Sequence, residues 1–175
     1  MREMIVVMLT AACLASAGTA TAQKSEQIPI IFDTDFVMPP ADDSMALMLA
    51  LQSPEFDILG ITTVAVNDSL EKATSDVLRM LEIARQDTIP VYQGADMPLV
   101  HEKSDDAVRK FGNWYSNDVP PGGFARKKIE DEAAVSFIVR TVMERPQEVP
   151  LVAIGPPTNI VHAICAEPEL AANVK

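Results

Sequence analysis

The chain has few of the residues on which several common functions depend. It contains 14 lysine and arginine residues against 25 aspartate and glutamate residues, which gives a formal net charge of -11 at pH 7. A protein that binds nucleic acid needs clustered positive charge to contact the phosphates, so this balance argues against a nucleic-acid partner. Only two cysteines are present, Cys13 and Cys165. A framework of several disulfide bonds is therefore excluded.

Long hydrophobic runs are also missing. The apolar run at residues 4–14 is too short to span a membrane as a helix. It follows Arg2 and precedes small residues that end at 20–22, which is the pattern of a secretory signal with cleavage before Gln23. We therefore expect export to the periplasm or to the medium, and no stable membrane insertion after cleavage. Cys165 is then the only cysteine left, and no intrachain disulfide can form.

The remaining chain has the composition and the pattern of an α/β domain. It is 48% hydrophobic and 22% charged over the full sequence, as in an ordinary globular domain. Short apolar runs alternate with segments of helical period, which predicts a mainly parallel open sheet with flanking helices in one domain, residues 23–175. The expected strands are 28–32, 56–65, 89–92 and 149–154, and the expected helices are 43–52, 69–85, 129–143 and 157–165.

Acidic residues gather around the first expected strand. This strand ends in Asp33 and Asp35, and a proline-containing loop then leads to Asp42 and Asp43 at the start of a helix. The carboxyl ends of parallel strands form the crevice where ligands bind, so we expect the four carboxylates to converge there. Their mutual repulsion favours a hard divalent cation, calcium or magnesium. Without a ligand, the second pair would favour a helix start and the first pair a solvated turn.

Three ordered motifs resemble the inosine-uridine preferring nucleoside hydrolase family. They are the acidic stretch described above, ITTVAVN at residues 61–67 and IGPPTN at residues 154–159. The resemblance extends from about residue 28 to the end of the chain. One departure is the loop between Asp35 and Asp42, which is three residues longer than the family's usual spacing. The family's domain is much longer, so we expect this chain to correspond to its N-terminal half, truncated at the C-terminal side.

The resemblance implies calcium-dependent hydrolysis of the N-glycosidic bond of ribonucleosides, which yields free base and ribose. Asp35 would ligate calcium and would also be the catalytic base that takes a proton from water. Asp43 would ligate calcium through its carboxylate. Ile154 matches a position that offers its backbone carbonyl to the metal. The family takes a further aspartate ligand from its C-terminal half, so we expect the 175-residue chain to be poorly active.

The resemblance also assigns residues to the substrate. Asp42 would bind the ribose hydroxyls, and Asn67 would contact the ribose. Asp33 would accept hydrogen bonds and orient the other acids. Thr158 and Asn159 open the last expected helix, where they could be helix caps or ligand contacts. Purine or pyrimidine preference stays open, because the residues around the leaving base would come from the C-terminal half.

A long segment without periodic pattern, residues 94–126, separates the third expected strand from the next helix. A loop of this length is usually functional or mobile. Phe111, Trp114 and Tyr115 in this segment could form a lid that stacks on a planar base, or a local hydrophobic cluster. His101 lies in the same loop, and a lone loop histidine is more often solvated than catalytic.

Two other functions remain open at this point. Asp33-Thr34-Asp35 after an apolar strand also matches the nucleophile motif of haloacid-dehalogenase-like magnesium phosphohydrolases, although the Asp42 and Asp43 pair has no place in that scheme. The chain could also be a non-catalytic exported fragment that binds nucleosides or cations. Apolar helix faces that further strands would cover also predict a homo-oligomer.

Overall fold

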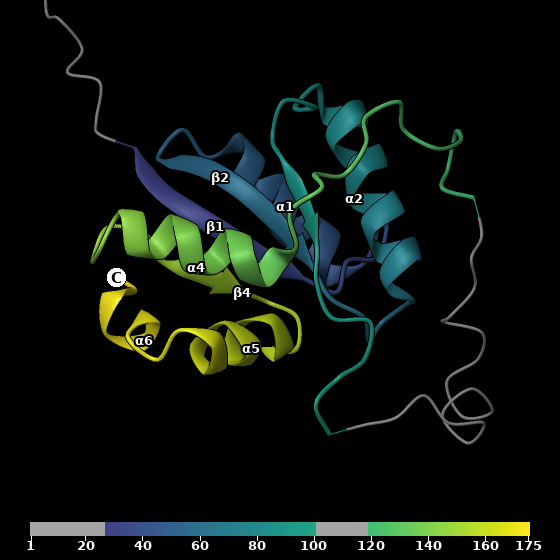
Figure 1. The fold of residues 1–175 in the computed structure, drawn as a ribbon. Helices are drawn as coiled ribbons and strands as arrows, with labels where there is room; N and C mark the ends of the chain where they lie inside the picture. Colours follow the sequence, from purple (N-terminus) through teal and green to yellow (C-terminus); the bar gives the residue numbers. More distant parts are fainter. Residues whose placement is uncertain (1–26, 101–118) are drawn as a thin grey trace, which may run out of the picture.

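The computed structural model describes residues 27–100 and 119–175. The predicted signal segment 1–22, His101 and the loop residues Phe111, Trp114 and Tyr115 lie outside the described residues. Within them, four strands form one parallel sheet in the order β3-β2-β1-β4 (Figure 1). This architecture confirms the α/β prediction. The strands are β1 (Ile28–Thr34), β2 (Phe56–Thr63), β3 (Val91–Gln93) and β4 (Leu151–Ala153).

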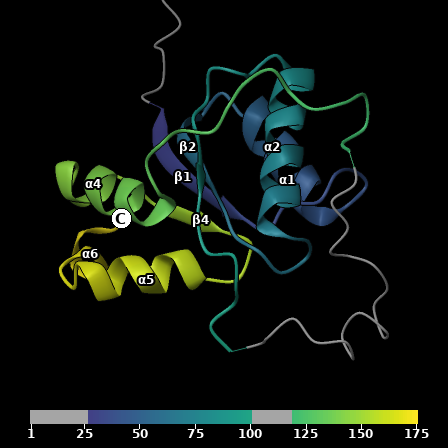
Figure 2. The same ribbon diagram turned by 45° about the vertical axis from the view of Figure 1, so that its right-hand side comes forward.

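Helices cover both faces of the sheet (Figures 1 and 2). Successive strand side chains point to opposite faces, and β1 shows this clearly. Phe32 packs in a core cluster with residues of α1 (Asp42–Gln52) and α2 (Leu70–Ala84). Ile31 packs on the other face with residues of α4 (Ala134–Glu144), α5 (Thr158–Ala166) and α6 (Leu170–Asn173). Both faces are therefore buried, as the continuous apolar pattern of β1 requires.

The helix α2 agrees closely with the helix expected at residues 69–85 and turns an apolar stripe to the core. Ser69 caps its first turn by accepting a hydrogen bond from the backbone N–H of Lys72 at 3.2 Å. Its inward residues are buried, and the helix ends at Arg85, which adopts a left-handed conformation with φ of 58°. The buried residues on this stripe are Leu70, Ala73, Val77, Met80 and Leu81.

The expected helix at 129–143 begins later than predicted, at Ala134. The preceding residues form no regular element and are tied to the edge strand β3 instead, because the backbone N–H of Glu130 donates to the carbonyl of Val91 at 2.9 Å. On this face Gly60 allows close packing, since a Cβ there would lie 2.6 Å from the ring of Phe137. Phe137 in turn stacks on Tyr92 with ring centroids 3.8 Å apart. In the described ranges no helix combines the length and the apolar character needed to cross a membrane.

Candidate functional site

Two of the predicted acids face each other beyond the end of β1. Asp35 and Asp43 are 5% and 4% exposed, and they come from the loop after β1 and from the first turn of α1. Burial raises the pKa of Asp35 to about 6 from its ordinary value of 3.8, and the charge of Asp43 contributes to the rise. The two carboxylates therefore share one small volume, as the sequence predicts for this pair.

Hydrogen bonds from three backbone and side-chain groups fix this pair. The hydroxyl of Thr34 donates to Asp43 Oδ1 at 2.7 Å. The side-chain amide of Asn67 donates to Asp43 Oδ2 at 3.2 Å, and its backbone N–H donates to Asp35 Oδ2 at 3.2 Å. Asn67 follows β2, the neighbour of β1 in the sheet, which explains how a residue 24 positions from Asp43 reaches it. The structure thus brings together Asp35, Asp43 and Asn67.

Asp33 is directed away from this pair. It is still part of β1, and its carboxylate lies on the face covered by α5, where Oδ1 accepts hydrogen bonds from Thr62 and, at 2.7 Å, from Asn159. Burial raises the pKa of Asp33, while these two hydrogen bonds oppose the rise. Its second oxygen, Oδ2, is buried and has no hydrogen-bond partner among the described residues.

Asp42 also lies apart from the pair, because consecutive positions on a helix point about 100° apart. It is exposed at the rim of a hollow of about 260 Å³ that is lined by Val37, Ala41, Asp42, Asn67 and Asp68. The expectation that all four carboxylates converge is therefore wrong. Only two do so, while Asp33 faces α5 and Asp42 faces the hollow.

The oxygen atoms of this site could supply some of the ligands of a hard cation. Among residues 27–100 and 119–175 no group of three acidic, histidine or cysteine side chains is arranged to hold a metal ion. Asp35 and Asp43 nevertheless offer carboxylate oxygens, which calcium and magnesium prefer. The turn after β4 lies directly against them, since a Cβ on Gly155 would come within 2.7 Å of the backbone nitrogen of Asp35 and 3.0 Å of its Oδ1. This close approach places the Ile154–Gly155 peptide unit beside the carboxylates, so the residues fit part of an oxygen shell.

Two residues of the site were not assigned this position by the sequence analysis. Thr34 lies between two predicted acids and is fully buried, and its hydroxyl supports Asp43. Asn159 is also fully buried, whereas the sequence suggested a cap or a ligand contact. The helix α5 begins after Pro157 without a side-chain cap, so neither Thr158 nor Asn159 caps it. Only the polar character of Thr34 at the end of an apolar strand could have indicated its role.

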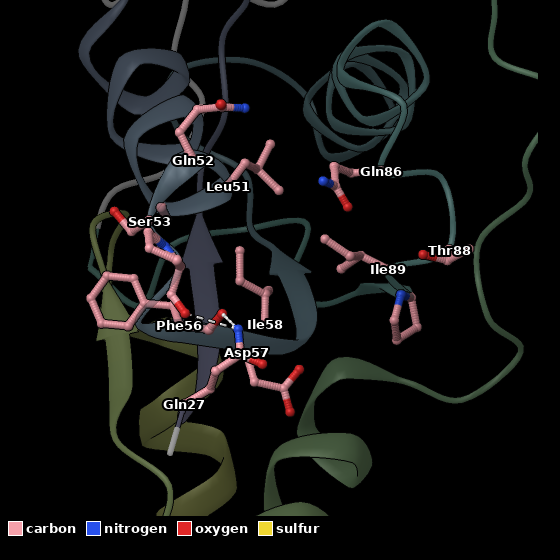
Figure 3. A pocket seen from close by; sticks show the side chains of 13 residues that line it. Gln27, Leu51, Gln52, Ser53, Phe56, Asp57, Ile58, Gln86, Thr88 and Ile89 are labelled. Atoms are coloured by element: carbon pink, nitrogen blue, oxygen red, sulfur yellow. Dashed lines mark hydrogen bonds between the residues drawn. The ribbon is translucent and has the colours of Figure 1, made fainter. Parts of the chain in front are cut away.

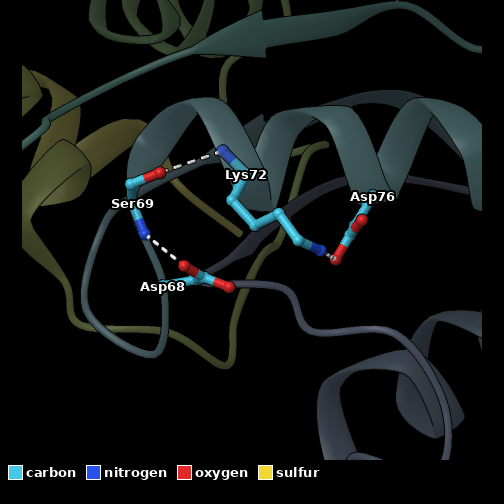
Figure 4. A network of polar contacts seen from close by, with 4 residues as sticks. All are labelled: Asp68, Ser69, Lys72 and Asp76. Carbon is cyan, nitrogen blue, oxygen red and sulfur yellow. Dashed lines mark hydrogen bonds and ion pairs between the residues drawn. The ribbon is translucent and has the colours of Figure 1, made fainter. Parts of the chain in front are cut away.

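A second polar network holds the start of α2 next to Asn67 (Figure 4). Asp68 accepts a hydrogen bond from the backbone N–H of Ser69 at 2.9 Å. One turn later Lys72 forms an ion pair with Asp76, whose side chain is fully buried. Burial raises the pKa of Asp76, and the contact with Lys72 opposes the rise. The network therefore fixes the helix end that follows Asn67.

A hollow larger than the one beside the acids lies elsewhere. Its volume is about 550 Å³, and it is formed at the amino end of β2, the end of α1 and the turn before β3 (Figure 3). Gln27 donates to the carbonyls of Pro54 and Phe56 at 3.0 and 3.1 Å at its edge. Among the described residues that line it, Asp57 is the only acidic or basic one. The described part of this lining thus has no pair of acids like that at the carboxyl end of the sheet.

Comparison with known proteins places this geometry in context. The model of the family described as inosine-uridine preferring nucleoside hydrolase matches residues 30–175. The chain is 38% identical over 148 residues to the pyrimidine-specific ribonucleoside hydrolase RihA of Salmonella arizonae, covering 84% of this chain and 46% of that protein. It is 40% identical over 149 residues to uridine nucleosidase 1 of Arabidopsis thaliana, covering 83% of this chain and 42% of that protein.

Solved structures of nucleoside hydrolases match the fold of this chain as well. A plant nucleoside hydrolase matches with a TM-score of 0.66 and 33% identity, covering 83% of this chain and 45% of that one. A purine-preferring ribonucleoside hydrolase from Gardnerella vaginalis matches with a TM-score of 0.70 and 28% identity, covering 83% and 46%. The chain thus spans less than half the length of these relatives.

Proposed function

Because the chain belongs to the inosine-uridine preferring nucleoside hydrolase family, we propose that its site serves the hydrolysis of ribonucleosides to free base and ribose. The observation that carries this proposal is the contact of Asp35, Asp43 and Asn67 at the carboxyl end of a parallel sheet. The names of the relatives, a ribonucleoside hydrolase and a uridine nucleosidase, support the same reaction class. The phosphohydrolase alternative is set aside, because the family match includes the Asp42 and Asp43 pair for which that scheme has no role.

Asp35 is the residue that we assign as the catalytic base. In the reaction, the oxygen of water bonds to C1′ of the ribose, and the bond from C1′ to the base nitrogen breaks. Its electron pair leaves with the base, which takes a proton from solvent, while a proton of the water passes to Asp35. A carboxylate with a pKa of about 6 is largely ionised at neutral pH and holds an accepted proton better than an ordinary aspartate does.

The same pair of acids is proposed to hold calcium. Asp35, Asp43 and the backbone carbonyl of Ile154 would contribute oxygen ligands, in keeping with the close approach of Gly155 to Asp35. A bound divalent cation would supply positive charge that lowers the pKa of water and fixes the ribose hydroxyls. These ligands are fewer than the roughly six to eight oxygens that calcium takes, so we expect weak binding by this chain alone.

The hollow beside the acids is the proposed place for the sugar. Asp42 and Asn67 both line it, and both carry groups that can hydrogen-bond hydroxyls. Val37 and Ala41 add an apolar wall. We assign Asp42 to the ribose hydroxyls and Asn67 to a further ribose contact. Asp33, held by Thr62 and Asn159, would orient the surrounding strand ends.

Export and assembly are also part of the proposal. Residues 1–22 are proposed to be a signal that is removed, which leaves a domain of residues 23–175 in the periplasm or the medium. Met45, Met48 and Leu49 on α1 are 60%, 46% and 71% exposed, and their spacing places them on one face of the helix. Such an apolar face supports the association of copies, which sedimentation of the mature chain at several concentrations would test.

The test of the proposed function is whether the 175-residue chain cleaves uridine and inosine. Cleavage is measured as the release of reducing sugar. We expect slow cleavage that requires calcium, and a further loss of about 100-fold or more in Asp35→Asn. Asp57→Asn is the matched control, because Asp57 is exposed and lies at the other end of the sheet. Calcium-dependent nucleoside binding without turnover would favour the binding fragment instead. Absence of both binding and cleavage would refute the proposal.

A further inference from the structure

Asn159 connects the carboxyl ends of three strands. Its side-chain amide donates to Asp33 Oδ1 at 2.7 Å and to the carbonyl of Thr63 at 3.0 Å. Its carbonyl oxygen accepts a hydrogen bond from the backbone N–H of Ala95 at 2.8 Å. These partners belong to β1, to β2 and to the segment that follows β3. Asn159 itself follows β4 in the chain, so one fully buried side chain joins the ends of all four strands.

Both N–H groups and the carbonyl oxygen of the Asn159 side chain have hydrogen-bond partners in this arrangement. An asparagine side chain has two N–H donors and one carbonyl acceptor, and each has a partner here. The backbone at Gly94 allows the close fit, because a Cβ there would lie 2.0 Å from Asn159 Oδ1. No other side chain of similar size offers two donors and an acceptor in one plane, so the position demands asparagine.

The hydrogen-bond partners of Asn159 are close in the chain, or hydrogen-bonded, to the residues that we propose as metal ligands. The backbone carbonyl of Asp33 accepts a hydrogen bond from the N–H of Ile154 at 2.9 Å, which fixes the turn after β4 against β1. Gly155 in this turn lies against Asp35. The carbonyl held by the amide, that of Thr63, ends the strand that leads to Asn67. Asn159 is thus hydrogen-bonded to two of the segments that meet around Asp35, and it follows the third, the turn after β4, in the chain.

We propose that Asn159 is the positioning residue of the site, which aligns Asp33, the turn after β4 and the end of β2 so that the Ile154 carbonyl, Asp35 and Asn67 converge. This inference rests on the proposed function for its consequence in catalysis. Its structural content is independent of that function, because it concerns how the strand ends are held.

The experiment compares backbone amide hydrogen exchange in the 175-residue chain and its variant Asn159→Ala. The reporters are the N–H groups of Asn67 and Ile154, which donate to Asp35 and to Asp33 rather than to Asn159. We expect both to exchange at least about tenfold faster in the variant, beyond any change in global unfolding. Val142→Ala is the matched control, since Val142 is buried in the core cluster on the α5 face and is remote from the site. The control should leave both reporters unchanged relative to global unfolding.

A second experiment swaps the asparagine and aspartate side chains between positions 159 and 33 and uses the same hydrogen-exchange reporters. Asn159→Asp places a carboxylate against Asp33 and against the carbonyl of Thr63, so it should loosen both reporters. Adding Asp33→Asn restores a donor and an acceptor between the two side chains but leaves the carbonyl of Thr63 without its donor, so exchange should slow again at the Ile154 reporter. This arm also decides the matter if Asn159→Ala does not fold. An effect confined to the amide of Ala95, or no recovery in the double variant, would overturn the inference.

Calcium titration separates this inference from the proposed function. If the wild-type chain binds calcium, Asn159→Ala should bind it about tenfold or more weakly, as is typical when residues that orient metal ligands are removed. Equal calcium affinity in the two proteins would overturn the inference. If the wild-type chain binds no calcium, the metal proposal fails, and the exchange experiment alone decides the role of Asn159.

Discussion

Replacement of Asp35 by asparagine should stabilise the fold at neutral pH when no divalent cation is present. The carboxylate is 5% exposed and close to Asp43, so its ionised form is disfavoured by burial and by repulsion. Asparagine has nearly the same shape and can still accept the hydrogen bond from the backbone N–H of Asn67. The substitution thus removes the unfavourable charge and retains the main contact.

The size of the effect follows from the raised pKa. The folded-state pKa of about 6 lies above the ordinary value of 3.8, so the folded state binds the proton more tightly than the unfolded state. Stability from this group is therefore present below pH 4 and is lost as the pH rises through about 6. At about 1.4 kcal/mol per pKa unit the loss approaches about 3 kcal/mol at pH 7. A weaker hydrogen bond to the neutral amide offsets about 1 kcal/mol, which leaves a gain of about 1 to 2 kcal/mol for Asp35→Asn.

Urea unfolding of both proteins at pH 7 and at pH 4, with a chelator present, measures this gain. We expect Asp35→Asn to unfold at higher urea at pH 7 and at nearly the same urea as wild type at pH 4. Excess calcium should reverse the order at pH 7, because only the wild type retains the ligand. Asp57→Asn serves as the control at each pH. A destabilised Asp35→Asn protein at pH 7, or an equal gain at both pH values, would refute the reasoning.

Three further substitutions test other parts of the site and the fold. Gly155→Ala should lower the melting temperature and weaken calcium binding in a titration, because the new Cβ would lie 2.7 Å from the backbone nitrogen of Asp35; unchanged affinity would contradict this. Thr34→Val keeps the side-chain shape and removes the donor to Asp43, so urea unfolding should show a loss of about 1 to 3 kcal/mol, and a loss below about 0.5 kcal/mol would count against that contact. Glu132→Gln removes an ion pair that lowers the pKa of Glu132, so stability should fall by less than about 1 kcal/mol at pH 7, and this loss should shrink as the pH drops below 4.5 and vanish below the lower pKa of the folded state, as thermal unfolding across this pH range would show.

Local patterns in the sequence predicted the fold well where one signal dominates. The continuous apolar run of β1 and the apolar stripe of α2 each indicated the right element, because burial on both faces or on one stripe leaves a clear pattern. The start of α4 was predicted five residues too early. Residues 129–133 keep apolar and charged positions that suit a helix, but the contact of Glu130 with Val91 draws the backbone to the sheet.

The candidate site was predictable as far as chain order determines it. Asp35, Asp43 and Asn67 follow elements that end at the same edge of a parallel sheet, so their proximity could be inferred from topology. The buried contact between Asp33 and Asn159 joins positions 126 residues apart, and no local period reports such a pair. The direction of each acid side chain likewise depends on where β1 ends and α1 begins.

The fit between Gly94 and Asn159 has a consequence for how this sequence can change over time. Any larger residue at position 94 would displace the amide and unpair the three groups that it holds. Loss of the asparagine, in turn, removes the reason for glycine at position 94. Each single change passes through an unfavourable intermediate, so the two positions should be inherited as a unit. If both codons are randomised together and folded proteins are selected, few residue pairs should be recovered. In each recovered pair, a larger residue at position 94 should occur with a smaller one at position 159.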